Sequence, residues 1–116
     1  MSYIEGFLTP VKIVDKDKYI AHAETAAKLF KQWGALRIVE TWADDVPEGK
    51  VTDFYRAVNR KDGETVVFSF IEYPDRATRD AVNVKMMNDP AMAAMSDMPF
   101  DGQRMIYGGF AVVLDA

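Results

Sequence analysis

Cysteine is absent from the sequence, so disulfide bonds and thiolate metal sites are excluded. Histidine occurs once, as His22, and a single histidine cannot supply a His-rich metal site. The chain has no run of roughly 18 apolar residues, the length that a membrane-spanning helix requires. Its first residues, MSYIEGFLTP, lack the basic and apolar blocks of a signal peptide. We therefore expect a cytoplasmic protein that has no membrane contact and holds no metal or other cofactor.

Clusters of basic residues are scarce as well. No more than two Lys or Arg residues are consecutive, and the formal net charge is −4. A surface that follows the phosphates of a nucleic acid needs a patch or stripe of positive charge. The sequence therefore predicts that nucleic acid is not a partner.

Hydrophobic residues make up 49% of the 116 residues. A chain of this length and composition can bury one core of useful size and is too short for two domains. No internal repeat, low-complexity tract or linker interrupts it. We expect one domain over residues 1–116.

Hydrophobic periodicity and turn residues divide the chain into strands and helices. The first helix begins near Asp15 and ends at Gly34, residues typical of a helix N-cap and of the position after a helix. Pro90 starts a short helical turn, because proline fits the first turn of a helix. The expected strands are residues 3–11, 35–43, 52–58, 64–73 and 104–114, and the expected long helices are residues 15–34 and 74–88.

The order of these elements predicts the fold. The segments TDFYRAV and ETVVFSFIEY flank NRKDG, which indicates a hairpin closed by Asp62 and Gly63. With or without the short strand at 52–58, the order is that of the split β-α-β plan. We therefore expect an α+β, ferredoxin-like βαββαβ subunit in which both helices cover one face of an antiparallel sheet.

The strands are apolar on both faces. In ETVVFSFIEY, Val66, Phe68 and Phe70 share one face, whereas Ile71 and Tyr73 point to the other. A sheet with one face in water would alternate apolar and polar residues. The second face therefore needs a cover, and we expect a second copy of the chain to provide it, in a homodimer. The sequence leaves open which face lies at the interface.

Four segments together resemble the YbaA-like family of unknown function. They are YIEGFLTPV, GALRIVETWADDVPEGKVTDF, ETVVFSFIEYPDRATRDAVN and MPFDGQRMIYGGF, and they cover nearly the whole chain. The last segment is the most specific of the four. Some members are labelled as connected to signal-recognition RNA, a role that the acidic balance of this chain does not support.

The fold of that family resembles the dimeric α/β-barrel superfamily. The resemblance implies that two ferredoxin-like sheets face each other and form a barrel with the helices outside. Relatives in the superfamily include cofactor-free monooxygenases, isomerases, heme enzymes and proteins of unknown role, and many place a ligand pocket between sheet and helices. A shared fold does not carry a reaction with it, so the chemistry has to be argued from the residues.

His22 is the candidate catalytic residue. On a helical wheel it borders the apolar stripe, beside Ala26, Leu29 and Trp33. A histidine at that edge can act as a general base or proton shuttle, or bind heme as in some superfamily relatives. The alternative is a half-exposed helix residue that makes one hydrogen bond.

Methionines gather in and around the segment before the last strand. Thioethers at a spacing of three can bind Cu(I), but neither a cysteine nor an export signal supports such a site. Unbranched Met side chains more often fill irregular contacts in a core or interface, or form an adaptable lid over a pocket. The residues are Met86, Met87, Met92, Met95, Met98 and Met105.

The segment DMPFDGQRMIYGGF supplies three further candidates. Asp101 precedes Gly102 and predicts a turn. Arg104 can pair with Asp101 or with a ligand carboxylate, and Tyr107 can orient a substrate oxygen. The simpler interpretation is a structural clasp, in which Asp101 and Arg104 hold the loop and two consecutive glycines allow a bulge or a close strand approach.

Glu40 is a charged residue on an otherwise apolar strand, and charged residues are seldom buried without a partner. It can pair with Arg56 across the sheet or act as the carboxylate of a site. Trp42 shares a face with Glu40 and can line an aromatic pocket, although aromatic residues belong more often to the core. The candidate pocket residues are therefore Glu40, Trp42, Arg56, Asp101, Arg104 and Tyr107.

Two functions fit these residues. The first is binding of a small apolar or aromatic metabolite between sheet and helices, with cofactor-free monooxygenase- or isomerase-like chemistry that uses His22 or a carboxylate as base. The second is a non-catalytic sensing or interaction module whose sheet face only dimerises. A deep pocket that contains His22 and an Arg or Tyr would favour the first function, and a filled core would favour the second.

Overall fold

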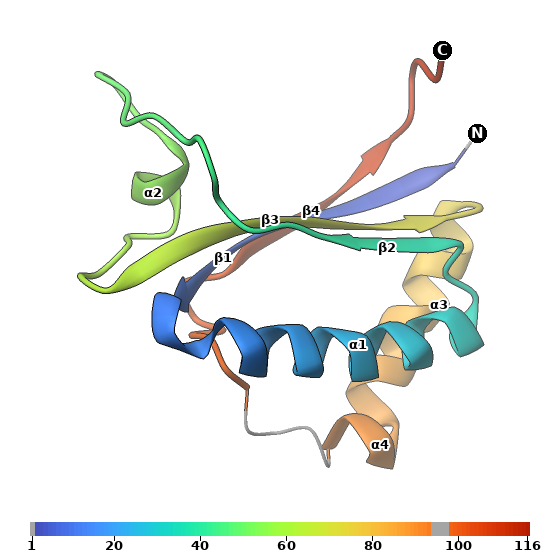
Figure 1. The fold of residues 1–116 in the computed structure, drawn as a ribbon. Coiled ribbons are helices and arrows are strands. Elements are labelled where there is room, and N and C mark those ends of the chain that lie inside the picture. Colours follow the sequence, from blue (N-terminus) through green and yellow to red (C-terminus); the bar gives the residue numbers. More distant parts are fainter. Residues whose placement is uncertain (1, 94–97) are drawn as a thin grey trace.

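The computed structural model describes residues 2–93 and 98–116, in which four strands form one antiparallel sheet. The strand order is β2-β3-β1-β4, so the two strands nearest the chain ends are neighbours. Two long helices pack together on one face of this sheet (Figure 1). The elements are β1 (Tyr3–Lys12), η1 (Ile13–Asp15), α1 (Lys16–Trp33), β2 (Arg37–Glu40), α2 (Phe54–Ala57), β3 (Glu64–Tyr73), α3 (Arg76–Asn88), α4 (Pro90–Ala93) and β4 (Ile106–Ala111). The expected ferredoxin-like βαββαβ plan and α+β class are confirmed.

The register decides which side chains face the helices. Residue Glu5 of β1 lies opposite Ile71 of β3, and Phe7 lies opposite Ser69. Because side chains alternate along a strand, residues two apart share a face. The helix-facing row of β1 therefore includes two polar residues, Glu5 and Thr9, and both are buried.

The two helices begin and end by different means. The side chain of Asp75 accepts a hydrogen bond of 2.7 Å from the backbone N–H of Thr78 and caps α3. Gly34 ends α1 with a φ of +129°, a conformation that a side chain makes costly. Its backbone N–H donates to the carbonyl oxygen of Lys31, so a carbonyl of the last turn is satisfied.

One predicted strand is wrong. Residues 52–58 do not pair with β3 but form the short helix α2, and NRKDG connects this helix to β3 instead of closing a hairpin. Asp53 is the reason, because its carboxylate accepts hydrogen bonds from the N–H groups of Arg56 and Gly49 at 2.7 and 3.0 Å. This N-cap satisfies backbone donors locally and so competes with strand pairing. Two other strands are shorter than expected: β2 ends at Glu40 and β4 ends at Ala111.

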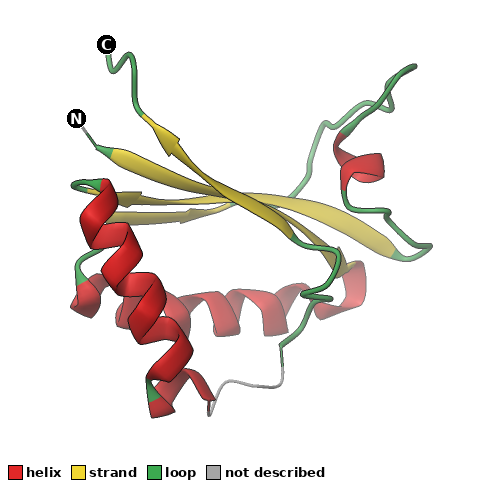
Figure 2. Ribbon diagram, turned by 180° about the vertical axis from the view of Figure 1, so that it is seen from behind, coloured by secondary structure: helices red, strands yellow, loops and turns green. Residues whose placement is uncertain are grey.

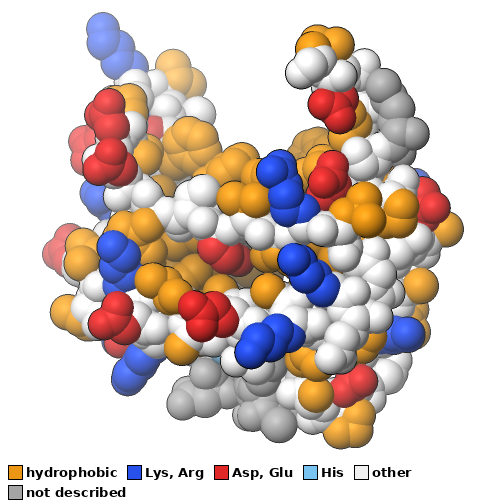
Figure 3. Space-filling view, turned by 45° about the vertical axis from the view of Figure 1, so that its right-hand side comes forward, with side chains coloured by type: hydrophobic (Ala, Val, Ile, Leu, Met, Phe, Trp, Pro, Cys, Tyr) orange, Lys and Arg blue, Asp and Glu red, His pale blue; other side chains and the backbone are white. Residues whose placement is uncertain are grey.

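The sheet face opposite α1 and α3 is open. The segment that carries α2 and the C-terminal segment both project on this side, as Figures 1 and 2 show. Hydrophobic side chains gather in the hollow between the two projections (Figure 3). Phe68, Ile106 and Phe110 are 49%, 45% and 62% exposed there. We call this surface the open face; its strand residues are Ile4, Leu8, Phe68, Phe70, Ile106 and Phe110.

Candidate functional site

A cavity of about 470 Å³ lies between the helix-facing side of the sheet and helices α1 and α3. The surface is hollowed between β2 and α1, with hydrophobic side chains visible inside (Figure 3). Small residues of α1 create this space, since Ala23, Ala26 and Ala27 face the sheet and are too short to fill it. The volume falls within the range of roughly 300–1,000 Å³ that small-molecule sites occupy. This part of the protein is therefore not a filled core.

The wall of the cavity is mostly apolar and aromatic. Phe7 and Ile71 come from the sheet, and Phe30 comes from α1. Methionines from α3, α4 and the segment before β4 complete the wall; they are Met86, Met87, Met92, Met98 and Met105. Met95 lies outside the described residues. Of the interpretations that the sequence leaves open for these methionines, lining the cover of a pocket corresponds to this arrangement.

One cluster of polar side chains in the cavity centres on Tyr19 and Glu40. The Tyr19 hydroxyl donates a hydrogen bond of 2.6 Å to Oε1 of Glu40, and Ser69 hydrogen-bonds with both side chains. Burial, reinforced by the charge of Glu40, raises the pKa of Tyr19 well above its usual range, so this hydroxyl stays a donor at neutral pH. Partial burial also raises the pKa of Glu40, although the hydrogen bonds oppose the shift. Glu40 remains an exposed residue of the edge strand β2, so solvent at the cavity mouth limits the increase.

His22 lies next to this cluster. It lines the cavity from α1, and its ring packs edge-on against Phe100 at a centroid distance of 5.8 Å. Tyr19 packs against the same Phe100 ring at 6.0 Å. Trp42 does not line the cavity, but its ring packs against Tyr19 at a centroid distance of 6.3 Å. The sole histidine and a hydrogen-bonded carboxylate thus share one end of the site.

A second cluster of polar side chains lies further along the sheet. The carboxylate of Glu5 accepts a charge-assisted hydrogen bond from Nη1 of Arg79, and Nη2 of Arg79 donates to the hydroxyl of Tyr3 at 3.2 Å. Glu5 is 3% exposed, so this pairing supplies the opposite charge that a buried carboxylate needs. Tyr73 also lines the cavity; burial and the charge of Glu5 raise its pKa to about 12, against the opposing effect of Arg79.

Asp101 and Arg104 form the expected clasp outside the cavity. Arg104 donates two hydrogen bonds of 2.7 Å to the carboxylate of Glu64, and its Nε donates to Asp101 at 2.9 Å. The bidentate guanidinium lowers the pKa of Glu64 to about 2. The clasp ties the segment after α4 to the start of β3. Tyr107, beyond the clasp, lines the cavity and stacks on Phe7 at 6.3 Å.

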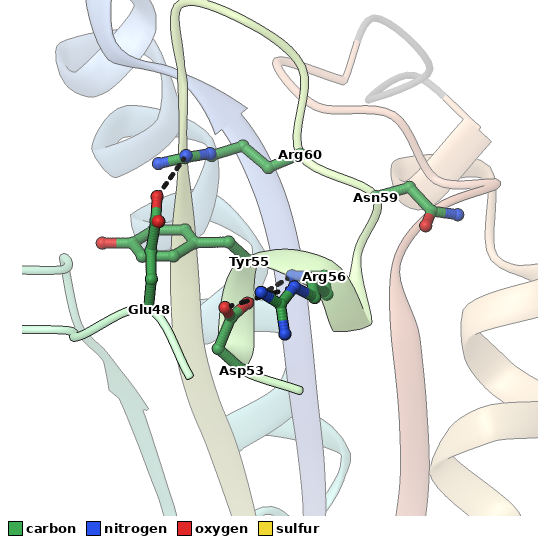
Figure 4. Close-up of a pocket in the computed structure, with 6 residues that line it drawn as sticks. All are labelled: Glu48, Asp53, Tyr55, Arg56, Asn59 and Arg60. Carbon is green, nitrogen blue, oxygen red and sulfur yellow. Dashed lines mark hydrogen bonds and ion pairs between the residues drawn. The ribbon is translucent and has the colours of Figure 1, made fainter. Parts of the chain in front are cut away.

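Arg56 is separated from the other candidates. It lies in a surface hollow of about 320 Å³ around α2, shown in Figure 4. There it pairs with Asp53 at 3.6 Å, while Arg60 pairs with Glu48 at 3.6 Å and stacks over Tyr55. Of the two alternatives for Glu40, pairing with Arg56 is therefore wrong, because the cap at Asp53 places Arg56 on the short helix α2 and Glu40 instead accepts from Tyr19. The charges of this hollow satisfy one another and brace the loop.

Several residues of the candidate site were not predicted from the sequence. The sequence pattern does not identify Tyr19, Glu5, Ser69 or Tyr73 as site residues. A signal exists for two of them, since Glu5 and Ser69 are polar residues within otherwise apolar strands. That both residues face the cavity depends on the register of β1 against β3, which the sequence pattern does not fix.

Within residues 2–93 and 98–116, no group of three or more His, Cys, Asp or Glu side chains could hold a metal ion. Nor does this described part contain a helix that is long and apolar enough to cross a membrane.

The sheet, its helix layer and the cavity between them define a ferredoxin-like α+β protein. A solved structure with the same fold is a dimeric ferredoxin-like protein from an uncultured marine organism; it is 19% identical, with a TM-score of 0.58, and the match covers 100% of both chains. At this identity the likeness concerns the fold alone.

The chain belongs to the family described as protein of unknown function DUF1428, whose sequence profile matches residues 2–102. It is 57% identical, over 116 residues and 99% of each chain, to the uncharacterized protein YbaA of Escherichia coli strain K12 and to its counterpart in Shigella flexneri. The resemblance carried by the four sequence segments is thereby confirmed.

Proposed function

We propose that the protein binds a small, largely apolar metabolite in the cavity between the sheet and helices α1 and α3. The observation that carries this proposal is the cavity itself, which combines an apolar wall with a few converging polar groups. It contains His22 together with Tyr19, Tyr73 and Tyr107, the combination that favours a ligand site over a structural core.

Proton transfer is the chemistry that this site supports best. Cofactor-free oxygenation and isomerisation can both begin when a base removes a proton from the substrate. Glu40 lies at the mouth of the cavity with Tyr19 as its hydrogen-bond donor, and its raised pKa brings it closer to neutral pH. His22 is the second candidate base and lies at the same end.

A thermal-shift screen with a metabolite library tests the binding proposal, because a ligand of the native state raises the melting temperature. Ala26→Phe should fill the cavity and abolish the shift that a hit produces. Ala21→Phe on the exposed side of α1 is the matched control and should keep the shift. A library without any hit, or a hit that Ala26→Phe binds as well as the wild type, would contradict the proposal.

We further propose that a second copy of the chain covers the open face. Phe54 of α2 packs edge-on against Phe68, yet about half of the Phe68 side chain remains exposed. Contiguous exposed apolar surface of this kind is characteristic of interfaces. A symmetric partner would use the same face on both chains.

The second candidate function, a non-catalytic module that only dimerises, rests on the same open face. The cavity and the open face lie on opposite sides of the sheet, so the two functions can be tested separately. Ligand binding that survives in a monomeric variant would support the metabolite site, and dimerisation without any ligand would support the module.

A further inference from the structure

The charges of the cavity are unevenly compensated. Its described lining contains two carboxylates, Glu5 and Glu40, and no Lys or Arg. Arg79, which lies behind the wall, pairs with Glu5. Glu40 has hydrogen bonds from Tyr19 and Ser69, but within the described part of the chain no cation lies within 4.0 Å of it. Among the described residues, the carboxylate of Glu40 at the cavity mouth therefore has no cation in contact with it.

A second observation comes from Tyr73. This residue is 0% exposed, and its hydroxyl has no hydrogen-bond partner among the described residues. A buried hydroxyl without a partner costs free energy, so such groups usually meet a ligand or an ordered water. Because Tyr73 is one of the residues that line the cavity, we take this hydroxyl as the candidate partner for a polar atom of a bound molecule.

The pairing of the strands sets roughly how far apart the two positions lie along the sheet. Glu40 lies opposite Ser69 in the β2–β3 pairing, and Tyr73 lies four residues beyond Ser69 on the same face of β3. At about 3.3 Å per residue, the Cα atoms of Ser69 and Tyr73 are roughly 13 Å apart. Apolar side chains, Ile71 among them, occupy the space between.

Resting on the proposed function, we infer that the ligand is an organic ammonium compound. Its ammonium group lies against Glu40 at the cavity mouth, its apolar body lies along the aromatic and Met-lined wall, and a hydrogen-bond acceptor at its other end meets the hydroxyl of Tyr73. A ligand carboxylate or phosphate would instead bring a second negative charge next to Glu40 without an Arg or Lys in the lining to neutralise it. The cavity thus discriminates by the sign of the ligand's charge.

Four small probes that share one aromatic body test the inference. Tyramine has both the ammonium and the hydroxyl oxygen, phenethylamine lacks the hydroxyl, 4-ethylphenol lacks the amine, and 4-hydroxyphenylacetate carries a carboxylate in place of the ammonium. Calorimetry with the wild-type protein at pH 7.5 should show that tyramine binds at least about 10-fold more tightly than 4-ethylphenol, the factor expected of a charge-assisted contact. Of the four probes, 4-hydroxyphenylacetate should bind to the wild-type protein most weakly.

Two conservative variants then assign the contacts. Glu40→Gln should weaken tyramine binding about 10-fold and leave 4-ethylphenol within about twofold. Tyr73→Phe should weaken tyramine and 4-ethylphenol about fivefold and leave phenethylamine unchanged. A variant that loses its cooperative thermal transition is set aside, since the order of the four wild-type affinities is a test by itself.

Each outcome separates the inference from the function on which it rests. If 4-ethylphenol binds and tyramine binds no more tightly, or if 4-hydroxyphenylacetate binds best, the ammonium inference is overturned and the apolar site remains. Equal loss of all probes in Glu40→Gln would also overturn it. If none of the four probes binds at millimolar concentration, the inference fails, and the metabolite library decides the proposed function independently.

Discussion

Glu64 and Arg104 form the most extensive charged contact of any two side chains in the described structure. The Glu64 side chain is 8% exposed, and its pKa falls from 4.5 to about 2 because Arg104 binds its carboxylate at two points. A folded-state pKa below the unfolded value means that ionised Glu64 stabilises the fold. This stabilisation is complete above about pH 4.5 and is lost as the pH falls toward 2.

Acid denaturation tests this contact. The shift of Glu64 corresponds to at most about 3 kcal/mol of unfolding free energy, lost between about pH 4.5 and 2. Glu64→Gln should be less stable than wild type by about 1–3 kcal/mol at pH 7 and should show a shallower pH dependence in that window. Urea unfolding at several pH values measures both effects. The exposed Glu24→Gln is the control, and a slope for Glu64→Gln equal to that of wild type would refute the assignment.

Two buried tyrosines give opposite expectations for the same substitution. Tyr19→Phe removes the hydrogen bond to Glu40 and should lower the unfolding free energy by about 1–2 kcal/mol. Tyr73→Phe removes a buried hydroxyl without a partner among the described residues and should leave stability unchanged or slightly higher. Thermal unfolding of the two variants, each without added ligand, measures the difference. A larger loss in Tyr73→Phe would mean that its hydroxyl already has a partner.

At the scale of elements, the connection from α1 to β2 depends on Gly34. Its φ of +129° disfavours any side chain, and a Cβ there would lie 2.9 Å from Cγ2 of Thr78 on α3. The same residue therefore ends one helix and allows the other helix to approach. This contact brings the C-terminal end of α1 close to the first turn of α3.

A series of Gly→Ala variants separates the two effects at Gly34. Gly102→Ala should be nearly neutral, because nothing lies within 4 Å and its backbone is ordinary. Gly63→Ala has open space but a φ of +81°, so it should cost about 1 kcal/mol. Gly34→Ala should cost more than Gly63→Ala, about 2–3 kcal/mol, because strain and crowding add. Chemical denaturation ranks the three, and equal losses at positions 34 and 63 would show that α3 moves away freely.

On the scale of the whole molecule, Phe68 and Ile71 distinguish the two sides of the sheet. Phe68 is 49% exposed on the open face, whereas Ile71 is 6% exposed in the core beneath the helices. Side chains alternate between the two faces along a strand, so Phe68 and Ile71, which are three residues apart on β3, point to opposite faces of the sheet. A charge at each position should therefore have a different consequence.

Association should be lost in one variant and folding in the other. Wild type should have a mass near 26.2 kDa, twice 13.1 kDa, by light scattering at micromolar concentration. Phe68→Asp should remain folded at half that mass, because the charge lies on the proposed interface. Ile71→Asp should unfold, since an unpaired buried charge costs several kcal/mol. A wild-type monomer across the micromolar range would refute the dimer.

Much of the fold was determined by the sequence itself. Periodicity located the strands of ETVVFSFIEY and YIEGFLTPV, and Asp15 and Gly34 marked the boundaries of the first helix, because these signals depend on neighbours along the chain. The two-sided apolar pattern of β3 likewise follows from alternation alone. Even the clasp of Asp101 and Arg104 could be anticipated, since its partners are three residues apart.

The candidate site was decided by the tertiary structure. Register brought Ser69 opposite Glu40, and helix packing brought Tyr19 to the same carboxylate across 21 residues of sequence. Arg79 reaches Glu5 across 74 residues. Local pattern cannot encode such distances, because many pairings satisfy the same alternation until the core selects one. The strand expected at 52–58 failed for the converse reason: the cap at Asp53 satisfied local donors that a sheet would otherwise have paired.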